Sequence, residues 1–245
     1  MRKFHIFTDL DGTLLGKEDY RYEVNMQLIS DLKGKGIGIS LNTSKTLSET
    51  ECWQYKLGLD SPFIIENGAA ILFPKNKFEL EQLKPHKVES RLRYFCIVLG
   101  MKIDSLEVLY RPYSERVTSL IHCPKNEAMS LTGLGGPVLQ RARTREFTLP
   151  LIIPDLCIKE ELASDASQIG ARLIEGGRFC HLQGNSDKGS SMLIAKKIIE
   201  ENLKGEVISI SLGDSENDLD MLRDSEYGIY LGSDQKMINE CARNN

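Results

Sequence analysis

The chain has 245 residues, of which 41% are hydrophobic and 27% are charged, and its formal net charge is −4. This length is sufficient for one large domain or two modest ones with a hydrophobic core. The composition excludes a disordered tail, a collagen-like fibre and a coiled coil, and without a basic excess we expect no nucleic-acid partner.

The first third of the chain predicts strands that alternate with helices. In chain order the pattern comprises a β-rich run at 4–8, a helical period at 24–34, an alternating strand at 37–41, a helix from the capping box Thr46-Leu-Ser-Glu49 to Gly58, and an apolar strand at 63–65. Such alternation is typical of a parallel α/β sheet.

The pattern changes between residues 84 and 184. The segments 94–99, 117–123, 147–153 and 178–182 read as strands of a separate α+β unit. The first pattern then returns, with a helix that opens at 186–189 and a strand at 207–212. We therefore predict a core made of residues 1–83 and 185–245, interrupted by an inserted domain of residues 84–184.

The cysteines and the apolar segments bear on the location of the protein. Six cysteines, at 52, 96, 123, 157, 180 and 241, include no Cys-x-x-Cys pair, so we expect reduced thiols. The N-terminus reaches an acidic residue too early for a signal peptide, and no apolar run approaches the roughly 18 residues that cross a bilayer. A cytoplasmic protein with no membrane partner is expected; its oligomeric state is left open.

Carboxylates follow two of the predicted strands. Asp9 and Asp11 come after the first strand, and Asp214 follows the strand at 207–212, with Asp218 one helical turn further on. The carboxyl ends of parallel strands meet at one edge of a sheet, so these groups can converge. An all-oxygen ligand set favours Mg²⁺, although any single aspartate could instead cap a turn.

Four motifs carry a family resemblance. Asp9-Leu-Asp11-Gly-Thr13, Thr43 at a strand end, Lys188 in Asp-Lys-Gly, and Gly213-Asp214-x-x-Asn217-Asp218 occur in the order seen in haloacid-dehalogenase-like phosphatases. The resemblance implies a Rossmann-like parallel-sheet core with an inserted α+β cap of the C2 type, which agrees with the break at residues 84–184.

The resemblance also implies roles for these residues. Asp9 would be the nucleophile that forms an aspartyl-phosphate, and Asp11 the general acid and then the general base. Thr43, through its hydroxyl and backbone N–H, would bind the phosphoryl group together with Ser44, Lys188 and Asn217. Mg²⁺ would be held by Asp9, the backbone carbonyl of Asp11 and Asp214, with Asp218 behind them.

Further segments are similar to the mannosyl-3-phosphoglycerate phosphatase family. They are Asn42-Thr43-Ser44-Lys45-Thr46, Pro62-Phe-Ile-Ile-Glu66-Asn67-Gly68, Arg145-Glu146-Phe147 and Gly176-Gly-Arg178-Phe-Cys-His181. This family implies a small phosphorylated glycoside, mannosyl-3-phosphoglycerate, as substrate and mannosylglycerate and phosphate as products. The stretch Thr148-Leu149-Pro150-Leu151 departs from the family pattern, so glucosyl-3-phosphoglycerate or another sugar phosphate is an alternative substrate.

Several side chains could bind such a substrate. Arg141, Arg143 and Arg145 would share one face if their segment is extended, where Arg143 and Arg145 could bind the glycerate carboxylate; a solvated strand edge is the alternative. Lys45 would add a cation. Glu66 and Asn67 could bind sugar hydroxyls, although Asn-Gly also forms ordinary turns. His181 is either a ligand or a packed core residue.

Two other functions fit the same acidic cluster. A phosphomutase would return the phosphoryl group to a substrate instead of to water. A non-enzymatic phospho-acceptor or phosphosugar sensor would use the Mg²⁺ cluster without turnover, but Asp11 and the large cap argue against it.

Overall fold

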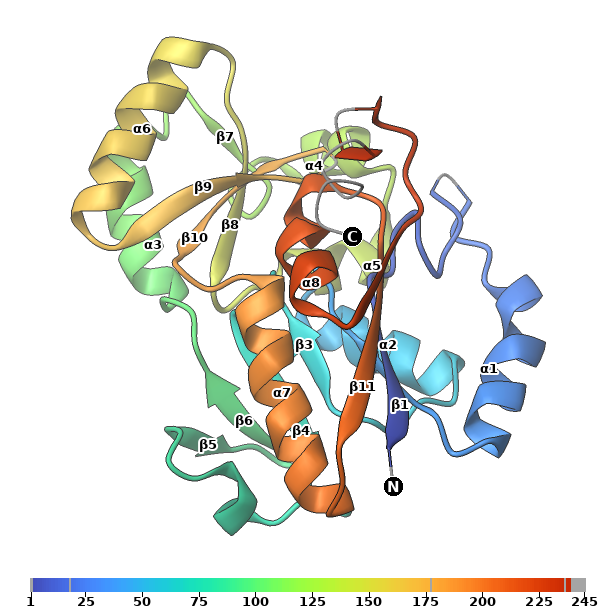
Figure 1. Cartoon of the computed structure of the whole chain (residues 1–245). Helices are drawn as coiled ribbons and strands as arrows, with labels where there is room; N and C mark the ends of the chain where they lie inside the picture. The colour runs from blue at the N-terminus through green and yellow to red at the C-terminus, as the bar shows by residue number, and fades with distance from the viewer. Residues whose placement is uncertain (1, 18, 177, 236, 239–245) are drawn as a thin grey trace.

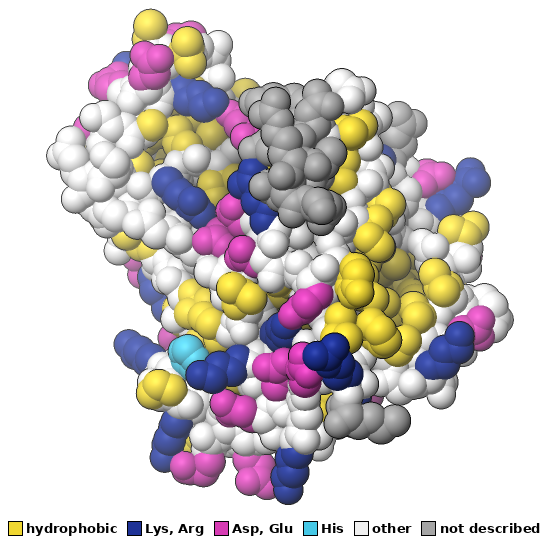
Figure 2. All heavy atoms as spheres, viewed as in Figure 1, with side chains coloured by type: hydrophobic (Ala, Val, Ile, Leu, Met, Phe, Trp, Pro, Cys, Tyr) yellow, Lys and Arg dark blue, Asp and Glu magenta, His cyan; other side chains and the backbone are white. Residues whose placement is uncertain are grey.

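The computed structural model describes residues 2–17, 19–176, 178–235 and 237–238. It has two regions, a core and a cap, each with its own sheet structure (Figure 1). Within the described ranges, no helix combines the length and the apolar character needed to cross a bilayer. On the face shown in Figure 2, acidic and basic side chains are interspersed, and neither sign forms a continuous field.

A parallel four-stranded sheet, ordered β12-β11-β1-β2, forms the centre of the core. Strands β1 and β11 pair from Lys3 with Val207 to Thr8 with Leu212, so their carboxyl ends reach the same edge. The bounds are β1 Lys3–Thr8, β2 Gly38–Leu41, β11 Val207–Gly213 and β12 Tyr227–Tyr230. The strands predicted at 4–8, 37–41 and 207–212 are therefore confirmed.

An antiparallel extension, ordered β3-β4-β6-β5, continues the core past β2. It joins the parallel sheet through a bridge between Asn42 and Ile64. The bounds are β3 Phe63–Ile65, β4 Ala70–Pro74, β5 Val88–Ser90 and β6 Tyr94–Val98. The strand predicted at 94–99 exists, but it pairs with β4 of the core, so we place the start of the cap near residue 101.

Helices cover both faces of the core sheet, as the strand–helix alternation predicts. Their bounds are α1 Met26–Gly34, α2 Leu47–Lys56, α7 Lys188–Leu203 and α8 Leu219–Asp224. Met192 and Ile199 of α7 pack with Phe7, whereas Ile29 of α1 packs with Leu41 on the other face. The predicted capping box of Thr46 and Glu49 begins α2, and the left-handed Gly58 follows its end.

The cap contains an antiparallel sheet, ordered β7-β8-β10-β9. Its elements are α3 Ile103–Tyr110, β7 Thr118–Ser119, α4 Lys125–Thr132, α5 Gly136–Arg143, β8 Thr148–Ile152, α6 Leu156–Gln168, β9 Ala171–Glu175 and β10 Cys180–Gly184. Leu106 of α3 and Leu162 of α6 pack with Leu149 and Leu182 of the sheet. The strands predicted at 147–153 and 178–182 are thus confirmed as β8 and β10.

Two local predictions in the cap are wrong. Only Thr118 and Ser119 of the segment 117–123 form a strand, because the amides of His122 and Cys123 bond back to Ser119 O in a tight turn. The arginine-rich segment, whose side chains would share one face if it were extended, instead forms helix α5 up to Arg143. The cysteines at 52, 96, 123, 157 and 180 are free, as predicted, and Cys241 lies outside the described residues.

Candidate active site

The loop after β1 presents two carboxylates at the carboxyl edge of the parallel sheet. The amide of Asp9 donates to Leu212 O at 2.9 Å, which fixes the start of the loop against β11. Gly12 has φ +80°, and a Cβ at this position would lie 2.4 Å from Asp214 Oδ2. A glycine is needed here because the loop both turns through the left-handed region and packs against a carboxylate from β11.

Lys188 joins two aspartates in a buried cluster. It is the first residue of α7, and its Nζ lies 2.6 Å from Asp9 Oδ1 and 2.6 Å from Asp218 Oδ1. The side chains of Lys188 and Asp218 are fully buried, and that of Asp9 is nearly so. The predicted convergence of Asp9, Lys188 and Asp218 is therefore observed, across 179 residues between Asp9 and Lys188.

Burial sets the electrostatics of this cluster. It raises the pKa of Asp9 above its ordinary value, and the charge of Lys188 opposes this rise. For Lys188, burial alone would lower the pKa, but the charges of Asp218 and Asp9 outweigh burial and raise it. Lys188 is therefore a cation at neutral pH. Its charge stabilises a carboxylate at a position from which water is largely excluded.

The segment after β11 supplies the other acidic groups. Asp218 Oδ2 accepts the amides of Asp214 and Ser215, both at 3.0 Å, so both oxygens of Asp218 have partners. Asp214 Oδ1 accepts from Ser215 Oγ at 2.9 Å, and its Oδ2 lies 3.3 Å from Lys17 Nζ. One oxygen from each of Asp9, Asp214 and Asp218 lies within 4.8 Å of the others.

This donor set fits a hard divalent cation. Asp9 and Asp214 would be its direct protein ligands, since the oxygens of Asp218 are already bonded to Lys188 and to two backbone amides. Asp11 is placed differently: its carboxylate turns toward the loop after β2.

The loop after β2 pairs with Asp11. Lys45 Nζ donates to Asp11 Oδ2 at 2.7 Å and lies over the ring of Tyr20. Burial alone would lower the pKa of Lys45, but the charges of Asp11 and Glu49 outweigh it and raise the pKa. Asp11 Oδ1 is buried and has no hydrogen-bond partner among the described residues. Lys45 thus holds one oxygen of Asp11 and the other is buried, while the side chain as a whole is partly exposed in the lining of the cleft.

Thr43 differs from the expectation in one respect. Its backbone N–H donates to Ile64 O at 3.1 Å and is not free to bind a phosphoryl group. Its hydroxyl oxygen accepts from the amide of Lys45 at 3.2 Å, which leaves the O–H proton able to donate. Ser44 lies nearby in the lining of the cleft.

A cleft between core and cap contains most of the predicted residues. It has a volume of about 390 Å³. The predicted site residues in its lining are Asp9, Asp11, Ser44, Lys45, Arg145, Asp214 and Asn217. Lys188, Asp218 and Thr43 lie buried outside this lining, and Lys188 and Asp218 bond within the acidic cluster.

Three residues predicted to bind substrate point elsewhere. Glu66 and Asn67 are buried outside the cleft lining, where their side chains hold other segments of the protein. The guanidinium of Arg143 bonds to the carbonyls of Ile121 and Cys123, because α5 turns this side chain into the cap. These assignments are therefore corrected, and Arg145 is the arginine of its segment that enters the cleft.

The structure adds cleft residues for which no role was predicted. Lys17, Tyr20 and Arg178 line the cleft, and Arg178 Nη1 donates to Thr132 O at 2.7 Å. His181, expected to be either a ligand or a packed core residue, is buried and also lines the cleft; burial is the main cause that lowers its pKa to about 3, and its Nδ1 has no partner among the described residues. Arg178 and His181 belong to the motif at residues 176–181 given above. The motif does not show which of its side chains turn toward the core; the pairing of β10 with β8 and β9 does.

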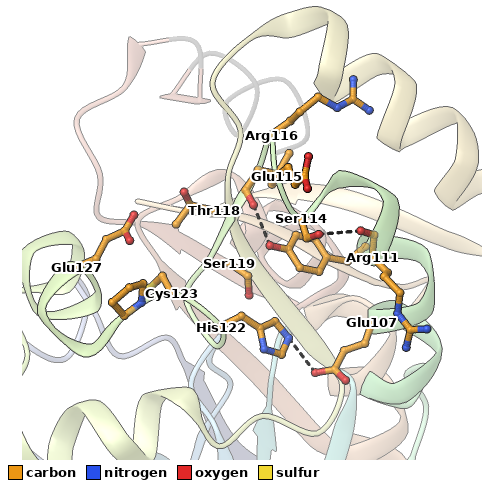
Figure 3. Close-up of a pocket in the computed structure, with 13 residues that line it drawn as sticks. Glu107, Arg111, Ser114, Glu115, Arg116, Thr118, Ser119, His122, Cys123 and Glu127 are labelled. Carbon is orange, nitrogen blue, oxygen red and sulfur yellow. Dashed lines mark hydrogen bonds and ion pairs between the residues drawn. The ribbon is translucent and has the colours of Figure 1, made fainter.

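A second cavity, of about 570 Å³, lies in the cap (Figure 3). His122 Nε2 approaches Glu107 Oε1 at 3.1 Å, and the ring of His122 stacks on Tyr110. None of its lining residues was predicted to be a site residue. The clustered carboxylates and the lysines favour the cleft as the reaction site.

Known proteins resemble this chain over most of its length. A model of the haloacid dehalogenase-like hydrolase family matches residues 6–97. A glucosyl-3-phosphoglycerate/mannosyl-3-phosphoglycerate phosphatase of Persephonella marina is 36% identical over 231 residues, which cover 92% of this chain and 84% of that protein. A mannosyl-3-phosphoglycerate phosphatase of Pyrococcus furiosus is 32% identical and covers 93% of this chain and 90% of its own length.

A solved structure supports the fold. A haloacid dehalogenase-like hydrolase from Bacteroides thetaiotaomicron matches with a TM-score of 0.66 and covers 98% of this chain and 92% of its own. Its sequence identity of 16% restricts the likeness to the fold.

Proposed function

The chain belongs to the mannosyl-3-phosphoglycerate phosphatase family of haloacid dehalogenase-like hydrolases, and on that premise we propose that it hydrolyses mannosyl-3-phosphoglycerate to mannosylglycerate and phosphate in the cleft around Asp9. Membership makes the chain a phosphoric monoester hydrolase. The observation that carries the proposed site is the buried cluster in which Lys188 bonds to both Asp9 and Asp218.

Asp9 would act as the nucleophile. Lys188 holds Asp9 Oδ1 at 2.6 Å, so the carboxylate has a fixed orientation at the edge of the cleft. Its attack forms a bond between an Asp9 oxygen and phosphorus, while the bond from phosphorus to the ester oxygen breaks. The product is an aspartyl-phosphate, and one difficult displacement becomes two easier ones.

Asp11 would move the protons. It would give a proton to the departing glycerate oxygen, and it would then accept a proton from the water that attacks phosphorus and releases Asp9. Its side chain is partly exposed in the lining of the cleft, and Lys45 keeps the carboxyl in place through Oδ2.

Mg²⁺ fits the acidic cluster, with Asp9 and Asp214 as ligands and Asp218 behind them. When bound, it would neutralise the charge of the transferring phosphoryl group. The Thr43 hydroxyl, Ser44, Lys188 and Asn217 would orient that group from the protein side.

Two cations in the cleft, one from the loop after β2 and one from the cap, support the proposal that the substrate is acidic. Lys45 and Arg145 both line the cleft, where they would bind the glycerate carboxylate. The departure from the family pattern at Thr148, Leu149 and Pro150 lies in buried strand β8, outside the cleft lining. That departure therefore gives no reason to exclude the mannosyl ester. Glucosyl-3-phosphoglycerate is kept as an alternative substrate because the 36% identical phosphatase of Persephonella marina is named for both esters.

The test is phosphate release by the purified protein with and without Mg²⁺. The substrates would be mannosyl- and glucosyl-3-phosphoglycerate, free 3-phosphoglycerate and hexose phosphates, with Asp9→Asn as the blank. We expect the mannosyl ester to have the highest kcat/KM, and chelation to abolish the activity. Equal and feeble rates on all esters would contradict the substrate proposal but leave the phosphatase chemistry intact.

A further inference from the structure

Glu66 and Asn67 lie where the core meets the cap, and the proposed reaction uses neither residue. We propose that this dipeptide positions the cap: Glu66 holds the segment that delivers Arg145, and Asn67 ties cap strand β10 to the catalytic loop at Asn217. The inference rests on the proposed function and assigns positioning residues to the same site.

Glu66 binds the start of cap strand β8. Its Oε1 accepts the amide of Glu146 at 2.9 Å, and its Oε2 accepts the amide of Phe147 at 3.1 Å and the hydroxyl of Thr148 at 2.8 Å. The residue is fully buried. Three donors from consecutive cap residues thus converge on one core carboxylate, which no sugar hydroxyl can reach.

The same network reaches the cleft through Arg145. Arg145 Nη1 donates to Thr148 Oγ1 at 2.6 Å and to Ser44 O at 3.2 Å. Thr148 in turn donates to Glu66. Glu66 therefore holds the Arg145 guanidinium indirectly, through Thr148. A shift of β8 would move this guanidinium within the cleft.

Asn67 connects the cap to the other side of the cleft. Its Nδ2 donates to Gln183 Oε1 of β10 at 3.0 Å, and its Oδ1 accepts from Asn217 Nδ2 at 3.0 Å. Gln183 and Asn67 are buried, whereas Asn217 lines the cleft. Strand β10 also carries His181, which lines the cleft. Asn67 therefore links this strand to the loop that contains Asp214 and Asp218.

The backbone of the dipeptide is bonded to the loop after β2, whose Thr43 and Ser44 are proposed to bind the phosphoryl group. The amide of Glu66 donates to Lys45 O, and that of Asn67 donates to Thr43 O, both at 3.0 Å. Glu66 and Asn67 have φ values of +48° and +57°, a region that residues other than glycine rarely adopt. Strained backbone that its surroundings hold in place is typical of functional positions.

Both connections between core and cap pass this point. The amides of Leu99 and Gly100 donate to Ala69 O at 2.9 and 2.8 Å. A Cβ on Gly68 would lie 2.0 Å from Asp187 O, and one on Gly184 would lie 2.7 Å from the amide of Met101. The chain therefore enters and leaves the cap against residues 66–69, which makes this segment the point where cap orientation is set.

Two substitutions isolate the side chains. Glu66→Gln keeps the size but turns an amide group toward backbone donors. Asn67→Gly removes both bridging bonds and suits the positive φ, so the backbone is not strained further. The control is Glu226→Gln, because the Glu226 carboxylate likewise accepts a backbone amide and a hydroxyl, both from Ser209 of β11, but lies in the core just before β12, where it also pairs with Lys196.

The first readout compares two substrates. For the glycosyl-3-phosphoglycerate, we expect both variants to lower kcat/KM by about 10²-fold, since small misplacements of binding groups have effects of this order. In Glu66→Gln, the rate with p-nitrophenyl phosphate, which carries no sugar or carboxylate for the cap to bind, should change little. In Asn67→Gly this rate should fall as well, because Asn217 loses the bond that holds it beside the phosphoryl group. A parallel loss on both substrates in Glu66→Gln, or no loss on either substrate in either variant, would overturn the proposal.

The second readout needs no substrate. Hydrogen exchange at the amides of Glu146 and Phe147 should be at least about tenfold faster in Glu66→Gln, with β1 and β11 unchanged and with no such effect in Glu226→Gln. Unchanged exchange would overturn the positioning role. If the wild type cleaves p-nitrophenyl phosphate but no glycosyl-3-phosphoglycerate, the substrate proposal fails, and the exchange rates decide the positioning role separately.

Discussion

The core and the cap hold their charges in different ways. In the core, Lys188 and Asp218 are fully buried and bonded to one another, and Lys188 bonds to Asp9 as well. In the cap, the half-buried Arg145 and the exposed Arg178 bond to neutral protein oxygens and line the cleft. A buried charge is stable only beside its partner, so the core is organised before a substrate arrives. The hydrogen bonds of the two cap arginines named here do not end on a carboxylate of the protein. An anionic substrate can provide the negative charge that these bonds lack.

The largest effect is expected from the core. Asp9→Asn removes the proposed nucleophile and should lower steady-state phosphate release by about 10⁴-fold or more. The measurement is phosphate release in a preparation checked for contaminating phosphatases. Substantial residual turnover would assign the nucleophile elsewhere.

Lys188→Ala should affect both catalysis and folding. It leaves Asp9 and Asp218 buried without their cation, and we expect kcat to fall by about 10²- to 10³-fold and the free energy of unfolding by about 3–5 kcal/mol. Denaturant unfolding and initial rates would measure the two effects. Lys197→Ala, on an exposed position of the same helix, is the control and should change neither.

The arginines of the cap allow a paired comparison. Arg145→Ala should raise KM for the glycosyl ester by about 10- to 100-fold, because a charged hydrogen bond to the carboxylate is lost. Arg143→Ala removes bonds to Ile121 O and Cys123 O and should lower cap stability without a specific rise in KM. Equal KM values for the two variants would contradict the different placement of these side chains.

A smaller effect is expected from two buried histidines, one in each region. Burial lowers the pKa of His5 in the core to about 4 and is the main cause that lowers the pKa of His181 in the cap to about 3. The unfolded chain takes up these protons near pH 6.5, before the folded protein does. Stability should therefore be complete above pH 6.5 and decline as the pH falls toward 4.

Each histidine would contribute a loss of about 2 kcal/mol between pH 7 and pH 5. The measurement is the free energy of unfolding in urea at both pH values. His5→Gln should remove the core part of the decline and His181→Gln the cap part. A decline that neither variant reduces would assign the acid sensitivity to other groups.

The sequence by itself determined the parallel core and the residues of its acidic cluster. Strand–helix alternation identified β1, β2, β11 and the helices between them, and the carboxylates that end β1 and β11 predicted where the acidic cluster forms. These features depend on local signals, namely hydrophobic period, caps and turn residues, which act within a few residues of the chain.

Only the tertiary structure decided which face each polar side chain takes. Glu66 and Arg143 are of the right chemical type to bind substrate, yet one holds strand β8 and the other holds carbonyls inside the cap. Likewise β6 pairs with β4 although its sequence suits the cap equally well. Strand partners and side-chain directions depend on contacts between distant segments, and the composition of one segment does not contain that information.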